Sequence, residues 1–592
     1  MAFEIYLPQT RIAASRGLWL DRLPVDDLDE AIRDGAGRTA FVGWNSAQGR
    51  EIRLSYAELG QRVDKIALGL LDRGVGRGDV VAFQLPNWWE FTALFYACNR
   101  IGAVANPLMP IFRQRELRFM LGFAEAKVAV VPRLWRGFDH VAMLREIRSD
   151  LPHLKHVFAV GGRDGQSFEE ALLDRPAVSH AEQDRLAKLR PGPNEVVELI
   201  YTSGTSGEPK AVMHTANTVL APARCFIDDI GLTGRDIVFM GSPYAHQTGF
   251  LYGMLMPVML GTTTVALDAW SVADAVPLIE REGTTFSMGS TPFLSDVVNL
   301  PDALRARVSR TLRTWVCAGA PIPRVLVQRA KAEMNLDVLS CWGMTENAGL
   351  TITRKSDPQA KVFETDGRAL PGNEVRVVDD QKRPVPADTV GHLQARGITH
   401  FVGYLKKPQL NSIDADGWFD TGDLARMDRD GYIRIVGRTK DVIIRGGENV
   451  PVAEVENLIY RHPGVAECAV VAMPDERLGE RACAFVTPKA DAQLDLRELT
   501  RFLGAEGMAK PYWPERLELL AEMPRTPSGK IQKFKLRAGW MAQELLTTFA
   551  QEVGSVTLTP DATGGVFELR VDGEIIWSRK ERGRFPEMRE IK

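Results

Sequence analysis

A short apolar stretch that runs into a cluster of glycines and hydroxyl-bearing residues constrains the fold of this chain most. Val196–Ile200 is apolar and partly β-branched, which predicts a buried strand. The residues that follow, up to Lys210, are mainly glycine, serine and threonine and predict a flexible loop. Glycines let backbone N–H groups approach a phosphate closely, and hydroxyls and a lysine add donors and charge. We therefore expect a phosphate-binding loop, although such clusters are often ordinary loops.

The loop differs from a Walker A loop. That motif has four residues between its two glycines and a lysine directly after the second one. Here Gly204 and Gly207 lie closer together, and Pro209 stands before Lys210. A different class of nucleotide-binding protein is indicated.

Helical and strand-like patterns alternate along most of the chain. A capping-box pattern at Ser55–Glu58 begins a helix that reaches Gly74, and Asn87 begins another. This rhythm predicts an α/β fold, with a large N-terminal domain of several subdomains built from layered helices and largely parallel sheets. The predicted strands are Gly78–Phe83, Lys127–Val131, His156–Val160, Ile237–Met240, Thr263–Leu267, Thr285–Met288, Thr314–Cys317 and Val338–Cys341.

The pattern changes after Gly431, where strand-like alternation ends in charged residues. We place a hinge at 438–441, after a large domain at 1–437. Strands at Ala466–Ala472 and Ala482–Pro488 and helices near Pro451 and at Asp495–Leu503 then predict a small α+β domain over 442–537. A tail of about fifty residues, 538–592, follows it.

Composition excludes several classes of protein. The 592 residues are 45% hydrophobic and 25% charged with a net charge of −3, so no basic excess favours nucleic acid. The six cysteines are scattered without a C-x-x-C pair, which argues against a disulfide framework or zinc site and suits the cytoplasm. No apolar run is long enough to span a membrane, so we expect a soluble cytoplasmic protein.

Three further segments combine with the loop into a known pattern. They are Cys341-Trp342-Gly343-Met344-Thr345-Glu346, Thr421-Gly422-Asp423 with Gly437-Arg438, and Arg525-Thr526-Pro527-Ser528-Gly529-Lys530. Taken alone, each has an ordinary interpretation as a turn, a cap or a solvated lysine. Together with Tyr201–Lys210, they resemble the adenylate-forming superfamily over roughly residues 30 to 537. That superfamily includes acyl-CoA synthetases, adenylation domains of peptide synthetases and firefly luciferase.

The resemblance implies a set of site residues and roles. Lys530 is implied as the catalytic lysine of adenylation, and His246 as a residue at the acyl group or the thiol path. Glu346 and Thr202 are implied as magnesium ligands, Lys440 as the hinge pivot, and Gly446 and Gly447 as the lining of a pantetheine channel. The implied ATP- or AMP-binding residues are Thr202, Ser203, Gly204, Thr205, Ser206, Gly207, Lys210, Gly319, Ala320, Pro321, Trp342, Gly343, Met344, Thr345, Asp423 and Arg438.

The resemblance also implies an activity. A carboxylic acid reacts with Mg-ATP to give an acyl-adenylate and pyrophosphate, and coenzyme A then takes the acyl group and releases AMP. The chain is most similar to ligases of alicyclic or short- to medium-chain acids. Its expected partners are ATP, Mg²⁺, coenzyme A and a small carboxylic acid, with a homodimer as the assembly to test.

The tail after 538 resembles a second family. The segments Leu536–Leu546 and Gly564–Lys580 are similar to the selenoprotein W-like (Rdx) family, and an Asp-Gly pair between alternating runs predicts a hairpin at Val566–Trp577. An amphipathic helix is predicted at Ala538–Phe549. The family's redox C-x-x-C is missing, because no cysteine follows Cys483. A packing or dimerising role, or a remnant of gene fusion, is favoured over a redox role.

Two other functions remain open at this point. The first keeps the adenylate but transfers the acyl group to a carrier-protein thiol. The second, from another class, is a non-catalytic nucleotide-binding interaction protein in which the tail is the working part.

Overall fold

The computed structural model describes residues 3–6, 17–162, 166–202, 209–439, 443–445, 448–475, 478–490, 492–526, 529–539, 568–571 and 574–578. Several predicted features lie outside these residues. They are Ser203, Gly204, Thr205, Ser206 and Gly207 of the loop, the hinge residue Lys440, Gly446 and Gly447, most of the predicted helix Ala538–Phe549, and the Asp-Gly turn of the hairpin.

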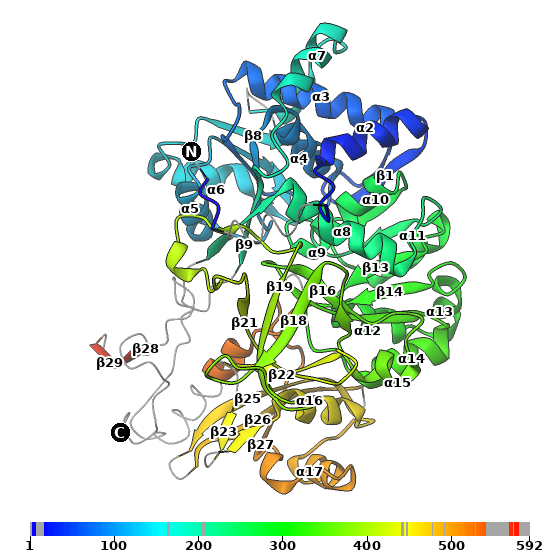
Figure 1. Ribbon diagram of the computed structural model, residues 1–592, viewed down its shortest axis with the longest axis vertical. Coiled ribbons are helices and arrows are strands. Elements are labelled where there is room, and N and C mark those ends of the chain that lie inside the picture. The colour runs from blue at the N-terminus through cyan, green and yellow to red at the C-terminus, as the bar shows by residue number, and fades with distance from the viewer. Residues whose placement is uncertain are drawn as a thin grey trace.

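Two large sheets form the upper part of the molecule (Figure 1). As far as the described residues extend, the first has seven strands, in the order β20-β10-β9-β4-β3-β5-β8. The five strands from β9 to the edge strand β8 are parallel, as predicted, whereas β10 pairs antiparallel with both β9 and β20. The bounds are Gly403–Tyr404, Lys210–Thr215, Val196–Thr202, Val104–Pro107, Val80–Phe83, Val128–Pro132 and His156–Val160, in the same order.

The second large sheet has nine strands within the described residues, in the order β17-β16-β15-β14-β13-β11-β12-β1-β2. The strands from β15 to β1 are parallel, and the pairs at both edges are antiparallel. The bounds are Arg368–Ala369, Ala348–Ile352, Asp337–Met344, Thr314–Cys317, Phe286–Gly289, Val238–Met240, Thr264–Leu267, Thr39–Asn45 and Arg50–Ser55, in the same order.

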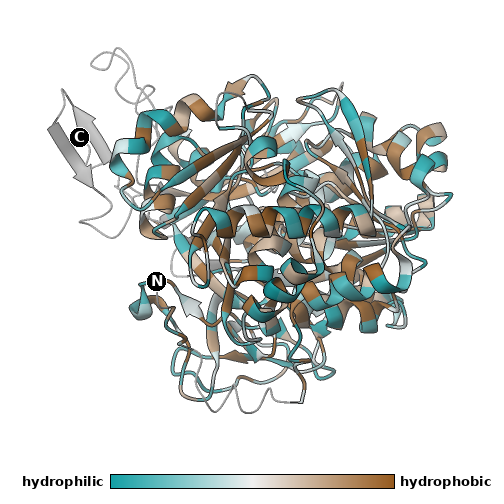
Figure 2. Ribbon diagram, turned by 90° about the horizontal axis from the view of Figure 1, so that it is seen from above, coloured by the Kyte–Doolittle hydropathy of each residue, from teal (hydrophilic) through white to brown (hydrophobic). Residues whose placement is uncertain are grey.

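Helices cover these sheets and show separate hydrophilic and hydrophobic stripes (Figure 2). The predicted capping box begins α3 (Tyr56–Asp72), where Ser55 and Glu58 cap each other's backbone N–H groups. Every residue of α4 (Trp89–Ile101) is buried, which fits its apolar and aromatic composition. The other long helices are α2 (Pro24–Gly35), α5 (Gln114–Phe123), α6 (His140–Ile147), α7 (His180–Leu189), α8 (Ala216–Ile230), α11 (Val272–Glu282), α12 (Thr291–Val298) and α14 (Arg324–Met334).

A four-stranded antiparallel sheet lies between the large sheets and the small domain (Figure 1). It contains β18 (Asn373–Val378), β19 (Gly391–Gly397), β21 (Phe419–Met427) and β22 (Ile433–Arg438). Strand β21 carries Asp423, and β22 ends at Arg438. These two residues are direct neighbours in the strand register.

The small domain packs one sheet against two helices, as the sequence predicted. Its sheet contains β24 (Glu448–Val450), β23 (Ile443–Arg445), β26 (Gly479–Pro488), β25 (Val465–Asp475) and β27 (Arg516–Leu519). Helix α16 (Val452–Arg461) and α17 (Leu496–Ala505) share its hydrophobic core. Beyond it, β28 (Glu568–Val571) and β29 (Glu574–Ser578) pair as the predicted hairpin.

None of the helices in the described part of the chain is both long enough and apolar enough to cross a membrane.

Candidate active site

The carboxyl ends of neighbouring parallel strands bring the predicted motifs together. Strands β13, β14 and β15 lie side by side in parallel, and each is followed at the same sheet edge by part of a motif. Ser290 follows β13, Gly319 follows β14, and Trp342–Met344 ends β15. Ligands of open α/β sheets bind beyond such strand ends, so the topology itself defines the site.

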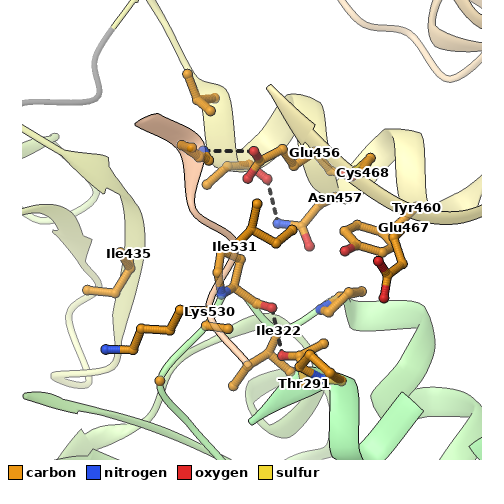
Figure 3. A pocket seen from close by; sticks show the side chains of 18 of the residues that line it. Thr291, Ile322, Ile435, Glu456, Asn457, Tyr460, Glu467, Cys468, Lys530 and Ile531 are labelled. Atoms are coloured by element: carbon orange, nitrogen blue, oxygen red, sulfur yellow. Dashed lines mark hydrogen bonds and ion pairs between the residues drawn. The ribbon is translucent and has the colours of Figure 1, made fainter. Parts of the chain in front are cut away.

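A cavity of about 1660 Å³ lies beyond these strand ends and continues between the large and small domains. Figure 3 shows Lys530 and Ile531 between Glu456 of the small domain and Thr291 and Ile322 of the large one. Nine of the predicted site residues line the cavity: Thr202, Gly319, Ala320, Pro321, Trp342, Gly343, Asp423, Arg438 and Lys530. Lys210, Met344, Thr345, Glu346 and His246 lie outside its lining.

The catalytic-lysine candidate is held in a tight turn against the large domain. The backbone N–H of Lys530 donates to Thr526 Oγ1 at 3.0 Å, and the N–H of Thr526 donates to the Lys530 carbonyl at 2.8 Å. Gly529 has a φ of +84°, and a Cβ there would lie 2.5 Å from Ser290 Oγ. Only glycine fits this position, because both the backbone conformation and the close approach exclude a side chain.

The Lys530 side chain reaches the end of β14. A Cβ on Gly319 would lie 3.7 Å from Lys530 Cε. Burial and the nearby charge of Arg438 lower the pKa of Lys530 to about 8, although Asp423 and Glu346 oppose the shift. The Lys530 ammonium therefore lies near two carboxylates. The resemblance implied Asp423 as a nucleotide-binding residue and Glu346 as a magnesium ligand.

Asp423 is buried and held by two donors. Trp342 Nε1 donates to its Oδ2 at 2.8 Å, and Arg438 Nε donates to its Oδ1 at 3.1 Å. A carboxylate offers about four acceptor positions, so it retains capacity for both hydroxyls of a ribose. The resemblance implied all three residues as ATP- or AMP-binding residues. The structure adds that the indole N–H of Trp342 orients the Asp423 carboxylate.

Replacing Trp342 by phenylalanine tests this contact, because it keeps an aromatic face and removes the N–H donor. Loss of a hydrogen bond to a charged acceptor predicts a fall of about tenfold in kcat/KM for ATP. The fall in kcat/KM caused by the substitution should be smaller with 3′-deoxy-ATP, which lacks one hydroxyl that Asp423 is expected to bind. An equal fall in kcat/KM for ATP and 3′-deoxy-ATP would contradict the orienting role of Trp342.

Glu346 is linked to Lys210 through a tyrosine that the sequence analysis missed. Tyr404 Oη donates to Glu346 Oε1 at 2.7 Å, and Lys210 Nζ lies 4.8 Å from the centre of the Tyr404 ring. Tyr404 lies on β20, which pairs with the strand that begins at Lys210. No pattern in the sequence marks Tyr404, since its partner Glu346 is 58 residues away.

A buried histidine supports the neighbouring Thr345. His214 Nε2 lies 2.8 Å from the Thr345 carbonyl, and its Nδ1 lies 3.0 Å from Thr218 Oγ1. Burial lowers the pKa of His214 to about 4, so the ring is neutral at pH 7. Because a carbonyl only accepts, Nε2 carries the proton. His214 therefore fixes the backbone of the motif that contains Glu346.

His246 is half-buried and caps the N-terminus of the short helix α9 (Gln247–Gly249). Its Nδ1 accepts the N–H of Thr248 at 3.3 Å, so its Nε2 carries the proton when the ring is neutral. Burial lowers the pKa of His246 to about 3, and the charge of Lys530 lowers it further. A neutral His246 near Lys530 is consistent with the predicted position beside the reacting acyl group.

Comparison with known families agrees with this geometry. The model of the AMP-binding enzyme family matches residues 28–405, and that of the AMP-binding enzyme C-terminal domain matches residues 454–530. The chain belongs to the AMP-binding enzyme family. The predicted adenylate-forming fold is thereby confirmed, and the Rdx family model matches residues 532–592, as the tail predicted.

Relatives of this AMP-binding enzyme include a CoA ligase and an AMP ligase. It is 36% identical over 546 residues to a medium-chain fatty-acid–CoA ligase of Escherichia coli (strain K12), covering 91% of this chain and 94% of the relative. It is 33% identical over 499 residues to a 2,3-dihydroxybenzoate-AMP ligase of Bacillus subtilis (strain 168), covering 84% and 90%. ATP-bound MatB from Rhodopseudomonas palustris superposes with a TM-score of 0.77 at 26% identity, covering 88% and 99%.

Proposed function

We propose that this AMP-binding enzyme is an ATP-dependent carboxylic acid–CoA ligase that works through an acyl-adenylate. The observation that carries the proposal is the insertion of Lys530 from the small domain into the cavity, next to Gly319 and within electrostatic reach of Asp423 and Glu346.

In the first half-reaction, a carboxylate oxygen of the acid attacks the α-phosphorus of ATP, and the bond from that phosphorus to the bridging oxygen of pyrophosphate breaks. Asp423 and Arg438 orient the ribose, and the segment Gly319–Pro321 provides a flat surface for the base. The Lys530 ammonium stabilises the negative charge that develops around the α-phosphate. Catalysis by this chain is thus positioning and charge stabilisation.

In the second half-reaction, the thiolate of coenzyme A attacks the acyl carbonyl carbon and AMP leaves. We propose that the small domain rotates about Lys440 between the two steps, which withdraws Lys530. Gly446 and Gly447 would then line the approach of the thiol. Hinge residues at the ends of elements suit such a motion.

We propose that Mg²⁺ is held by Glu346, with Thr202 and the phosphates of ATP. The described residues contain no cluster of three or more metal-binding side chains. Magnesium, however, is often held by one or two carboxylates plus substrate phosphates. Glu346 is one buried carboxylate that keeps acceptor capacity beside Tyr404, so the residues fit. When bound, the ion would neutralise phosphate charge.

We propose an alicyclic or short- to medium-chain monocarboxylic acid as the substrate, which the similarity to the medium-chain ligase supports. We also propose that the large domain ends at 437 and that 438–441 form the hinge, followed by a lid domain at 442–537 and a tail at 538–592. A cytoplasmic location is supported by six cysteines that are all buried and unpaired.

Release of pyrophosphate from Mg-ATP, measured with a panel of alicyclic, aromatic and straight-chain acids, tests the proposal. Each acid is assayed with and without coenzyme A. Release with one class of acid that coenzyme A accelerates is the expected result. Release that is indifferent to coenzyme A would favour a carrier-protein acceptor. The absence of release with every acid, while ATP still binds, would overturn the proposal.

A further inference from the structure

The segment that follows Lys530 is joined to the small domain by a buried ion pair. Lys533 Nζ lies 2.8 Å from Glu456 Oε1, and the Glu456 side chain is only 5% exposed. The same oxygen accepts the N–H of Val470 at 2.7 Å. Glu456 therefore joins three pieces of chain, namely α16, β25 and the stretch just after the catalytic-lysine candidate.

A second ion pair holds the segment on the other side of Lys530. Arg525 Nη2 lies 2.5 Å from Glu467 Oε1, and Arg525 Nη1 donates to the Gly529 carbonyl at 2.6 Å. Arg525 and Ile531 form a backbone bridge. Figure 3 shows Glu456, Glu467, Lys530 and Ile531 around the same cavity.

The short tether between Lys530 and Lys533 makes the first ion pair important for the site. Three residues span at most about 10 Å when fully extended, so the position of Lys533 restricts that of Lys530. The backbone N–H of Gln532 donates to the Pro524 carbonyl at 2.8 Å, which shortens the tether further. An unpaired Glu456 would leave a charge buried without compensation, and the segment would be expected to shift.

Lys533 also lies within the part of the chain that matches the Rdx family. The match to the C-terminal domain of the AMP-binding enzymes ends at residue 530, and the Rdx match begins at residue 532. Lys533 occupies the region where the resemblance to that family would place its missing redox motif.

We infer that the Lys533–Glu456 ion pair positions the Lys530 turn for adenylation, so that the first residues of the Rdx-like segment support the ligase active site. The inference rests on the proposed role of Lys530. Lys533 acts as a positioning residue, since its ammonium pairs with Glu456. The start of the Rdx match is thereby joined to helix α16 of the small domain.

The Lys533→Met variant of the full-length chain tests the inference, with Lys535→Met as a matched control. Lys535 is exposed in the same segment, and the described contacts include no side-chain partner for it. Adenylation is followed by single-turnover pyrophosphate release with octanoate, and thioester formation by reaction of supplied octanoyl-AMP with coenzyme A. Lys533→Met should slow adenylation by roughly 10- to 100-fold, because small misplacements of a catalytic group are costly.

Thioester formation by the same variant should stay within about twofold of the unmodified protein, since Lys530 is withdrawn in that step. Lys533→Arg should restore adenylation because it keeps the cation. Equal adenylation rates for Lys533→Met and Lys535→Met would overturn the inference, and so would equal loss of both half-reactions.

Two further variants separate the possible causes of failure. Lys533→Met combined with Glu456→Gln removes both charges and should fold even if the single variant does not, because a neutral pair leaves no buried charge. It should adenylate as slowly as Lys533→Met, and full activity would overturn the inference. If the Lys530→Ala variant forms the adenylate at the normal rate, the proposed role of Lys530 is wrong. If Lys530→Ala is slow but Lys533→Met forms the adenylate at the normal rate, only the positioning role of Lys533 is wrong.

Discussion

Replacing Lys530 by alanine is expected to slow adenylate formation by roughly 10²- to 10³-fold, the usual cost of losing one donor at a developing charge. The ammonium comes from the small domain and lies beside Gly319, where the α-phosphate is proposed to react. Thioester formation from a supplied acyl-adenylate should be nearly unchanged, because the lysine is proposed to leave the site before that step. The two half-reactions are measured separately, by pyrophosphate release and by loss of free thiol.

The split between the half-reactions is the informative result. Lys530 is half-buried between the two domains, so its removal could change the packing between them as well as the charge in the site. General disruption of the interface would slow both half-reactions, whereas loss of one charge slows only the first. Thr526→Ala is a useful companion, because it removes the hydroxyl that accepts the Lys530 N–H while keeping the ammonium. Thr526→Ala should also slow adenylate formation while leaving thioester formation nearly unchanged, but by a smaller factor than Lys530→Ala.

Much of this site follows from the sequence, since its residues stand at the ends of predicted strands. The predicted strand Thr314–Cys317 has the observed bounds of β14, and Gly319 lies two residues after its end. Val338–Cys341 was predicted three residues short at its carboxyl end, because β15 continues through Trp342 to Met344. Apolar β-branched strands in parallel sheets are buried on both faces, so their sequence signal is strong.

The four-stranded sheet that carries Asp423 was not predicted as a sheet. In strand β18 only the first residue and the last two are buried, and β22 is mostly half-buried, so neither gives a continuous apolar run. Antiparallel strands with one solvated face give a weaker signal. The motif Thr421-Gly422-Asp423 was recognised by resemblance, and the pairing of Asp423 with Arg438 depends on a strand register that the sequence does not display.

The contacts that orient the motif residues were the least predictable. Tyr404 with Glu346, His214 with Thr345 and Trp342 with Asp423 are side-chain contacts between elements far apart in the chain. Such contacts depend on how elements pack, whereas periodicity reports only which face of an element is buried. The sequence therefore predicts which groups do the chemistry, and the fold determines what holds them.

The rate of adenylation should fall as pH rises above about 8, because Lys530 must carry its proton to stabilise the α-phosphate. Burial lowers the pKa of Lys530 to about 8, with the ammonium form below that pH and the neutral amine above it. The value of kcat/KM for ATP, which reports the free enzyme, should be flat below about pH 7 and fall about 50-fold from pH 8 to pH 10. In kcat the fall should begin at higher pH, since bound phosphate favours the ammonium.

Two neighbouring groups do not titrate in this range. His246 has a pKa of about 3 and stays neutral, and burial raises the pKa of Tyr404 so that its hydroxyl stays protonated. Lys530→Arg supplies the decisive control, because arginine keeps its charge to well above pH 10. Its residual adenylation, however slow, should be flat from pH 7 to about pH 10. The same decline in this variant would show that another group titrates, and the assignment of the pH dependence to Lys530 would be wrong.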